Sequence, residues 1–235
     1  MNVLIACEES QRVCIEFRKM GFNAFSCDLL DCSGGHPEWH IKDDCLPLIT
    51  TECGFFKGIF ETSDGEIHTF RKWDLIIAHP PCTYLTVTGN RWFNIEEYGN
   101  DAKLRYKERL DAVRFFMNIV LYANTEHLAI ENPIGIMSSY YRKPNQIIHP
   151  YMFGDQARKA TCLWLKGLPN LIPTDEVEPE IIRYKNGKGT DNPWHMDTMK
   201  LPPDERARER SKTFPGIAKA MAQQWGSYLL ENERK

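Results

Sequence analysis

The stretch Trp73-Asp74-Leu75-Ile76-Ile77-Ala78-His79-Pro80-Pro81-Cys82 joins an apolar run to a rigid turn that ends in a thiol. A short, continuous run of branched apolar residues is typical of a parallel strand that is buried on both faces. The two prolines end this strand and set the direction of the chain after it. Open α/β sheets bind their ligands at the carboxyl ends of parallel strands. The stretch therefore predicts an α/β fold with Cys82 at its functional edge.

A second predicted strand is followed by a carboxylate. The segment His127-Leu128-Ala129-Ile130 is short and mostly apolar, and Glu131-Asn132-Pro133 comes directly after it. Because parallel strands end at the same edge of a sheet, Cys82 and Glu131 can meet in one crevice. We interpret Cys82 as a nucleophilic thiolate and Glu131 as the acid that assists it.

This pair of groups suits chemistry on cytosine. A pyrimidine ring is a poor carbon nucleophile until a thiolate adds to its carbon 6. The addition is easier when an acid hydrogen-bonds ring nitrogen 3, where negative charge develops. Two plainer interpretations stay open, namely Cys82 as a small buried residue and Glu131 as a helix-capping carboxylate.

The length and composition of the chain indicate one large domain. Its 235 residues suffice for an α/β domain with room for a small appendage, and 42% hydrophobic with 26% charged residues is ordinary for a globular protein. No apolar run reaches the roughly 18 residues that a membrane helix needs. Asn2–Ala6 resembles a core strand and not a secretory signal, so we expect a cytoplasmic protein. The net charge of −3 disfavours broad, non-specific affinity for nucleic acid but allows a local basic face.

The eight cysteines are spread along the chain without a repeated short spacing. A chain of this size needs no disulfide framework, so we expect reduced thiols. The sequence contains no Cys-x-x-Cys, and Cys27 with Cys32 is only a loose match to a metal-binding pattern. We therefore predict no metal site.

Strand and helix patterns alternate from the N-terminus, which predicts a βαβ beginning. Asn2–Ala6 is the first predicted strand, and Ser10 is a candidate cap for a helix that ends at Gly21. Phe22–Asp28 alternates like a second strand. The predicted helix places three apolar side chains on one face, at Val13, Phe17 and Met20.

Later segments continue the α/β pattern. Residues 101–123 are the clearest predicted helix, a crossover between the two strands that carry the candidate site. Residues 55–70 and 181–190 have the pattern of inserted hairpins, the second with an Asn-Gly turn, and residues 161–165 fit a strand. A final helix is predicted over residues 217–230. The apolar faces are Leu110, Val113, Met117 and Val120 in the crossover helix, and Ala218, Met221, Ala222, Trp225 and Leu229 in the final helix.

Pro80-Pro81-Cys82 and Glu131-Asn132 together resemble the hallmarks of the cytosine carbon-5 DNA methyltransferases, in which these motifs end consecutive strands of the sheet. The resemblance implies a Rossmann-like, S-adenosylmethionine-dependent methyltransferase fold in which Cys82 forms a covalent adduct with the target base. It also implies DNA as the partner, with the target cytosine flipped out of the helix. Pro81 would lie beside the cofactor.

A third motif, Gln156-Ala157-Arg158-Lys159, is similar to the family's Gln-x-Arg-x-Arg signature. An arginine of that signature supports the flipped cytosine, and Arg158 would take this role. Ala160 stands where the family has a second arginine. An ordinary solvated side chain is the alternative interpretation of Arg158.

The predicted cofactor end matches the family in layout more than in residues. Where the family has a Phe-x-Gly-x-Gly turn, this chain has Ala6 followed by Cys7, Glu8, Glu9 and Ser10. Backbone N–H groups of such a turn would bind the carboxylate of S-adenosylmethionine, with Ser10 as the helix cap. Further along, Asp28 resembles the acid that accepts hydrogen bonds from the ribose, and Asp44 the acid that takes the adenine amino group, although Asp44 also fits a plain loop turn.

The resemblance implies a methyltransferase domain of residues 1–164 and 211–235, with residues 165–210 as a reduced, irregular recognition appendage. Trp194 and His195 are candidates for stacking on an extruded base, or for packing under a loop. Basic residues of the appendage suit phosphate contact, but nearby acidic residues fit a solvated helix face equally. The basic residues are Lys185, Lys188, Lys200, Arg206, Arg208 and Arg210.

Three functions follow as hypotheses. The first is methylation of cytosine carbon 5 in DNA with short or relaxed specificity, as in a phage or mobile-element modification enzyme. The second is methylation of a free pyrimidine nucleotide, which would explain the small recognition region. The third is a non-catalytic, methyltransferase-like module that binds DNA or protein, which the glycine-poor turn after Ala6 suggests. We expect no obligate protein partner.

Overall fold

The computed structural model describes residues 1–50, 58–69, 71–184 and 190–233. These residues form an α/β fold around a seven-stranded sheet with the order β3-β2-β1-β6-β7-β9-β8. Neighbours among the first five strands are parallel, whereas β9 is antiparallel to both β7 and β8. The strands are β1 (Asn2–Ala6), β2 (Asn23–Asp28), β3 (His40–Lys42), β6 (Leu75–Ala78), β7 (Leu128–Pro133), β8 (Gln146–Ile148) and β9 (Thr161–Lys166).

The order of the strands reverses beside β1. The chain first adds β2 and β3 on one side of β1 and then crosses over to add β6 and β7 on the other side. The connections that leave β1 and β6 therefore diverge and open a crevice at the carboxyl ends of these strands. This topology confirms the predicted Rossmann-like fold and places the crevice directly beside the end of β6.

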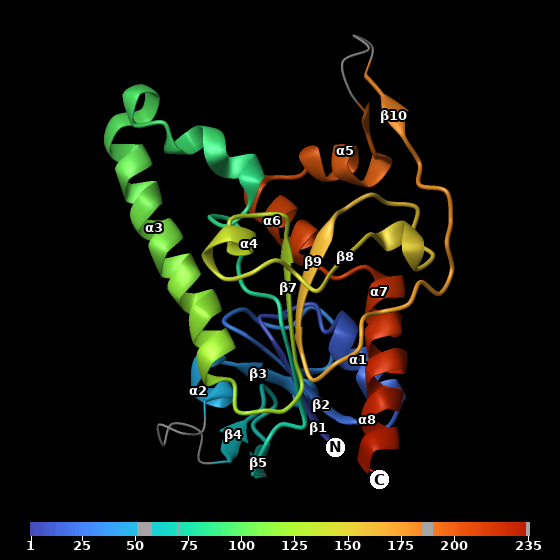
Figure 1. The fold of residues 1–235 in the computed structure, drawn as a ribbon. Helices are drawn as coiled ribbons and strands as arrows, with labels where there is room; N and C mark the ends of the chain where they lie inside the picture. Colours follow the sequence, from blue (N-terminus) through green and yellow to red (C-terminus); the bar gives the residue numbers. More distant parts are fainter. Residues whose placement is uncertain (51–57, 70, 185–189, 234–235) are drawn as a thin grey trace.

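Helices cover both faces of the sheet, as Figure 1 shows. Alternate side chains of each strand point to opposite faces, so Val3 and Ile5 of β1 join one core cluster whereas Leu4 and Ala6 join the other. The first face packs against α1 (Arg12–Lys19) and the C-terminal helices, and the second against α2 (Leu46–Ile49) and α3 (Ile95–Tyr122). Strands that are buried on both faces explain the continuous apolar runs of the sequence.

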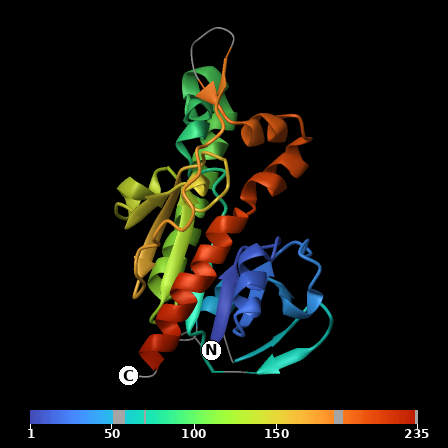
Figure 2. The ribbon, with the colours of Figure 1, turned by 90° about the vertical axis from the view of Figure 1, so that its right-hand side faces the viewer.

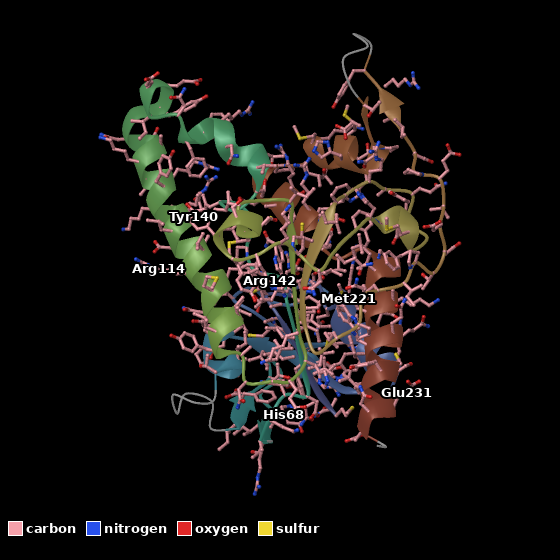
Figure 3. The ribbon with its side chains drawn as sticks, viewed as in Figure 1. His68, Arg114, Tyr140, Arg142, Met221 and Glu231 are labelled. Atoms are coloured by element: carbon pink, nitrogen blue, oxygen red, sulfur yellow. The ribbon has the colours of Figure 1, made fainter. Side chains whose placement is uncertain are left out.

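The C-terminal helix is one continuous rod with a wider central turn. It consists of α7 (Pro215–Ala220), a π-helical turn (Met221–Trp225) and α8 (Gly226–Glu233). The apolar face that the sequence predicts is buried at all five positions. In Figure 3, Met221 lies on this helix beside the sheet, whereas Glu231 lies near its exposed end.

The crossover helix differs from its prediction. Helix α3 already begins at Ile95, and Gly99 interrupts it with a φ of +53°, a backbone conformation that favours glycine. Phe116 and Ile119 are fully buried, but Leu110 of the predicted apolar face is 52% exposed. The reason is that only the C-terminal half of α3 reaches the sheet. Its N-terminal half rises beyond the carboxyl ends of the strands (Figure 1).

Two short hairpins are appended to the sheet. The hairpin of β4 (Ile59–Glu61) and β5 (Ile67–Thr69) confirms the described part of the predicted insertion; residues 55–57 and 70 of it lie outside the described residues. Strands β10 (Ile182–Arg183) and β11 (Thr190–Asp191) pair where the second hairpin is predicted. The Asn-Gly turn expected there also lies outside the described residues.

Two structures project at the end of the molecule where the parallel strands finish (Figures 1 and 2). The first, here called the helical arm, is residues 87–106 and contains the 3₁₀ helix η2 (Val87–Phe93) and the start of α3. The second is the outer part of the appendage, residues 181–210, with β10, β11 and most of its two short helices. The start of the predicted appendage instead belongs to the core, because Leu165 and Lys166 end β9 and Leu171 is buried. No helix in the described part of the chain has the length and apolar character to cross a membrane. The remaining helices are η1 (Pro37–Trp39), α4 (Met137–Tyr140), η3 (Pro150–Met152), α5 (Pro193–Met199) and α6 (Pro203–Ser211).

Candidate active site

Cys82 and Glu131 lie at the carboxyl ends of two neighbouring parallel strands. Ala78 of β6 pairs with Ile130 of β7, so Cys82 and Glu131 both follow the last paired position. Past this point β7 no longer pairs with β6 but still pairs with antiparallel β9, where Glu131 lies opposite Leu163. This support from β9 keeps the Glu131 backbone extended and directs its side chain into the site.

His79 joins this pair. Its Nδ1 lies 3.0 Å from Oε2 of Glu131, and the two side chains are only 7% and 14% exposed. The His79 backbone N–H donates to the carbonyl oxygen of Ala6, which attaches the end of β6 to the end of β1. Nε2 of His79 is buried and has no hydrogen-bond partner among the described residues. Sequence reasoning overlooked His79, although a polar residue between a buried strand and two prolines was a visible signal.

The loop that carries Cys82 is held firmly on both sides. The Asn132 side chain donates a buried hydrogen bond of 2.7 Å to the carbonyl oxygen of Pro80. After Cys82, the N–H groups of Leu85 and Thr86 both donate to its carbonyl oxygen, at 3.0 and 3.1 Å. Gly135 approaches this turn so closely that a Cβ there would lie 2.1 Å from the Leu85 carbonyl oxygen. Asn132 of the Glu-Asn dipeptide therefore has a structural role, because it holds the turn that carries Cys82.

Lys159, and not Arg158, is the cation that acts on Cys82 and Glu131. The charge of Lys159 lowers the pKa of both groups, which places it within electrostatic range of each. Its Nζ donates to the carbonyl oxygen of Arg210 at 2.8 Å. Arg158 is exposed and lines a separate cavity of about 300 Å³ with His149 and residues 190–192. Neighbouring residues of an extended segment point in opposite directions. Lys159 therefore faces Cys82 and Glu131, whereas Arg158 faces away from them.

Three acidic groups of the site have shifted pKa values. Burial, and then the charge of Glu131, raise the pKa of the Cys82 thiol, and Lys159 opposes them. Burial alone would raise the pKa of Glu131, but the hydrogen bond and charge of His79, with Lys159, bring it below its ordinary value. Burial raises the pKa of Glu8 to about 7, although His79 and two backbone hydrogen bonds lower it. At neutral pH the site therefore combines a protonated thiol with an ionised Glu131.

The turn after β1 reaches its shape without glycine. Cys7 and Gln11 adopt left-handed conformations with φ values of +59° and +57°, which glycines usually supply. The carboxylate of Glu8 accepts hydrogen bonds from the N–H groups of Val13 and Cys14, at 2.7 and 3.2 Å, in the first turn of α1. These amides are therefore not free for a ligand.

The prediction that Ser10 caps this helix is wrong. The residue at the N-cap is Gln11, whose side chain makes no capping hydrogen bond. Glu8 satisfies the helix N-terminus from three residues earlier instead, because its longer side chain reaches over the turn. The Gln11 side chain spans to His36, donating to its carbonyl oxygen at 2.8 Å and accepting from its N–H at 3.1 Å.

The two predicted cofactor acids lie at the ends of neighbouring strands. Asp28 ends β2, its Oδ1 accepts from the N–H of Leu30, and burial raises its pKa. Leu29 and Leu30 beside it are 71% and 54% exposed, which is unusual for large apolar side chains. Asp44 is exposed, and its Oδ1 accepts from the N–H of Leu46 at the start of α2. Pro81 is exposed directly before Cys82.

The appendage is attached to this edge through its arginines. Arg208 of α6 forms an ion pair of 3.1 Å with Glu9 in the turn after β1. Arg206 donates to the carbonyl oxygen of Leu201, and Arg210 to the hydroxyl of Thr198. The three arginines therefore have partners within the protein; Lys185 and Lys188 lie outside the described residues.

The aromatic candidates of the appendage are half-buried and have partners within the protein. The ring of Trp194 lies 5.0 Å from that of Phe214, and Lys159 approaches both rings at 5.8 and 6.0 Å. His195 hydrogen-bonds Asp191 at 2.7 Å. This packing positions Lys159 and agrees with the plainer of the two interpretations. All cysteines of the described residues are free thiols, and no group of three metal-binding side chains occurs in the described ranges.

Comparisons with known proteins add a distant similarity. No family model and no curated protein matches the chain. Among solved structures, one similar chain is named as a candidate DNA modification methyltransferase encoded within a prophage of Escherichia coli, with 17% identity and a TM-score of 0.41. The match covers 86% of this chain and 56% of that chain, so this chain spans little more than half of its length. At this score the similarity assigns neither fold nor activity, and both rest on the sheet and the site described above.

Proposed function

We propose that the protein methylates carbon 5 of cytosine in DNA, with Cys82 as the nucleophile. The observation that carries this proposal is the meeting of Cys82 with a hydrogen-bonded, buried carboxyl group, Glu131, at the ends of adjacent parallel strands. A thiol beside an acid is what attack on carbon 6 of a pyrimidine needs. Methylation of an amino group needs no thiol, because the amine already has a lone pair.

The chemistry assigns a task to each group of the site. Cys82 Sγ bonds to carbon 6, and the electron pair of the C5–C6 double bond moves through the ring towards nitrogen 3. Glu131 hydrogen-bonds nitrogen 3 and stabilises that charge. Lys159, held by the Arg210 carbonyl oxygen, favours the thiolate over the thiol. The predicted support of the flipped cytosine by Arg158 stays a proposal; from the edge of its cavity, Arg158 is also a candidate for contact with the DNA backbone.

S-adenosylmethionine would supply the methyl group at the end of β1 and β2. Asp28 offers a carboxylate to the ribose hydroxyls, and the exposed side chains of Leu29 and Leu30 offer an apolar surface to the adenine. Asp44 faces solvent near the end of β3, where it could accept from the adenine amino group. The helix amides do not fit the predicted role, since Glu8 occupies them. Cys7, Glu9 and Pro81 line the same edge.

The helical arm supports DNA as the substrate. Trp92 is 39% exposed, and the guanidinium of Arg91 lies 4.5 Å above its ring. An exposed aromatic residue beside an exposed arginine suits the bases and phosphates of nucleic acid. Sequence reasoning had limited recognition to the appendage, where Arg206, Arg208 and Arg210 are engaged internally. We infer that the arm supplies part of the missing contact surface.

Nucleoside mass spectrometry tests the proposal. The protein is incubated with duplex DNA and deuterated-methyl S-adenosylmethionine, and the digested nucleosides are compared with those from Cys82→Ser. We expect labelled 5-methyldeoxycytidine with the wild type only. Label on deoxycytidine monophosphate but not on DNA would identify the nucleotide-level enzyme. No labelled product, from a folded protein that binds DNA, would identify the non-catalytic module.

A further inference from the structure

We propose that His79 is a positioning residue that supplies a proton to Glu131, so that Glu131 meets ring nitrogen 3 as an acid. This inference rests on the proposed function and adds a residue to it. It gives a task to a side chain that lies inside the decisive stretch of the sequence and that the cysteine and carboxylate chemistry does not use.

The first argument is geometric. His79 Nδ1 and Glu131 Oε2 are 3.0 Å apart, and both side chains are nearly withdrawn from water. The backbone hydrogen bond from His79 to Ala6 and the side-chain hydrogen bond from Asn132 to Pro80 hold the two strand ends in register. Two groups held this rigidly at hydrogen-bond distance can exchange a proton without rearrangement.

The second argument concerns the state of Glu131. The hydrogen bond and charge of His79, together with Lys159, outweigh burial and lower the pKa of this carboxyl group. An ionised carboxylate accepts hydrogen bonds but has no proton to donate. Nitrogen 3 gains negative charge during attack by the thiolate and needs a donor. Nδ1 of His79, 3.0 Å from Oε2, is the nearest side-chain nitrogen that can supply this proton.

The charged surroundings fit this task. Cys82, Cys162 and Lys159 face Glu131 from the Cys82 loop, from β9 and from the segment before β9. Glu8 is buried within electrostatic range of His79 on the β1 side. His79 therefore lies between two carboxyl groups, and its second ring nitrogen is buried without a hydrogen-bond partner among the described residues. Such an imidazole is isolated from bulk water, which keeps its proton in the site.

The proposed step balances in protons and electrons. Cys82 first releases its thiol proton to water. As the bond from its Sγ to carbon 6 forms, the displaced electron pair reaches nitrogen 3. His79 passes its Nδ1 proton to the carboxylate of Glu131, and Glu131 passes a proton to nitrogen 3. When Cys82 leaves at the end of the reaction, the proton returns along the same path. No oxidant or reductant takes part.

The experiment separates proton supply from simple support. His79→Asn keeps an N–H donor near Glu131 but cannot carry a titrating proton, and His79→Ala removes both. His127→Asn is the matched control, because His127 lies at the opposite end of β7 and bonds the carbonyl oxygen of Asp74 at 3.1 Å. Near-ultraviolet circular dichroism confirms that each variant is folded. If a His79 variant is not folded, His79→Gln is used in its place.

The first readout needs neither DNA nor cofactor. Carbon-13 NMR follows the titration of the Glu131 carboxyl group, assigned with Glu131→Gln. We expect its midpoint to rise in His79→Ala, since burial is then opposed by Lys159 alone. His127→Asn should leave the midpoint in place. A midpoint that does not move in His79→Ala overturns the pairing, whatever the protein does to DNA.

The second readout is the pH profile of methyl transfer. Turnover of the wild type is compared with that of His79→Asn over a range of pH. His79→Asn should be slower by about 100-fold and should have a different pH profile, because its side chain carries no titrating proton. Wild-type turnover with an unchanged profile in His79→Asn would reduce His79 to a support and overturn the proposal. A wild type that makes no 5-methylcytosine would contradict the proposed function instead, which the NMR titration does not depend on.

Discussion

Cys82 lies between charges of opposite sign. Glu131 and burial raise the pKa of its thiol, and Lys159 lowers it. A free thiolate would be open to alkylation and oxidation. A site that keeps the thiol protonated until the target cytosine binds therefore protects Cys82. Removing the charge of Glu131 should therefore raise the reactivity of Cys82, and removing the charge of Lys159 should lower it.

The first prediction concerns the rate at which iodoacetamide alkylates Cys82 near neutral pH. Glu131→Gln should speed alkylation by several-fold, up to about tenfold, because loss of the negative charge lowers the pKa of the thiol. Lys159→Met should slow it for the opposite reason. Peptide mass spectrometry of the Cys82 peptide measures the rate, with Cys82→Ala as the blank. Changes of the same sign in both variants would contradict the charge arrangement.

The sequence placed Cys82 and Glu131 correctly at strand ends because two apolar runs and their breakers are local patterns. His79 was within the same stretch but needed the neighbouring strand to show its partner. Lys159 and Arg158 could not be separated, since the direction of each side chain depends on how the segment enters β9. Contacts between distant segments are what a one-dimensional pattern leaves out.

At the scale of elements, the turn between β1 and α1 adopts left-handed backbone conformations without using glycine. Two left-handed residues shape the turn, and the carboxylate of Glu8 satisfies the helix amides. The arrangement buries an acidic group whose pKa is raised to about 7. Such a group makes stability depend on pH.

The second prediction follows from that shift. The folded protein holds the Glu8 proton more tightly than the unfolded chain, whose pKa is near the ordinary 4.5. Glu8 therefore contributes stability below this value that is lost as pH rises through about 7. From about pH 5 to about pH 7.5, urea denaturation should show Glu8→Gln gaining about 2 kcal/mol relative to the wild type. Glu16→Gln, on the outer side of α1, is the control and should show no such trend.

The third prediction tests the element ends that would hold the cofactor. Calorimetry with S-adenosylhomocysteine should show one site per chain, and Asp28→Ala should weaken binding by about tenfold or more through loss of charge-assisted hydrogen bonds to the ribose. Asp31→Ala, in the loop after β2, is the matched control because its carboxylate pairs with Lys42. Equal affinities of the two variants would remove Asp28 from the cofactor site.

Most long elements were predictable, whereas two short strands at the edges of the sheet were not. The first strand, α1, β2 and the C-terminal helix follow from periodicity and agree with the structure. Strands β3 and β8 have three residues each and leave no pattern in the sequence. Leu110 was predicted to lie on the buried face of its helix but is exposed. Helical periodicity identifies an apolar side of a helix but does not show where the sheet beneath it ends.

At the scale of the whole molecule, the helical arm and the appendage project at the edge where the site lies (Figure 1). The net charge of −3 gives no general attraction to DNA, so local cations must provide it. Arg206, Arg208 and Arg210 of the appendage are engaged within the protein, and the arm carries Arg91 and Trp92 at the surface. DNA should therefore contact the arm.

The fourth prediction is that Arg91→Ala weakens DNA binding and lowers the salt slope of the affinity by about one unit, as expected for one lost phosphate contact. Trp92→Ala should weaken binding with little change in slope, because stacking is not a charge interaction. Lys72→Ala is the control, since Lys72 is equally a surface cation but lies at the amino end of β6. Fluorescence anisotropy at several salt concentrations measures all three. An unchanged slope in Arg91→Ala would place DNA elsewhere.

The covalent step is tested most directly by trapping. Duplex DNA with 5-fluorocytosine in place of cytosine carries fluorine where a proton must leave carbon 5, so the adduct cannot be resolved. With S-adenosylmethionine present, the account predicts a denaturation-resistant complex whose proteolysis yields one modified peptide, with the base attached to Cys82, and none from Cys82→Ser. A protein that methylates ordinary DNA at cytosine carbon 5, yet forms no adduct or forms it at another residue, would contradict Cys82 as the nucleophile.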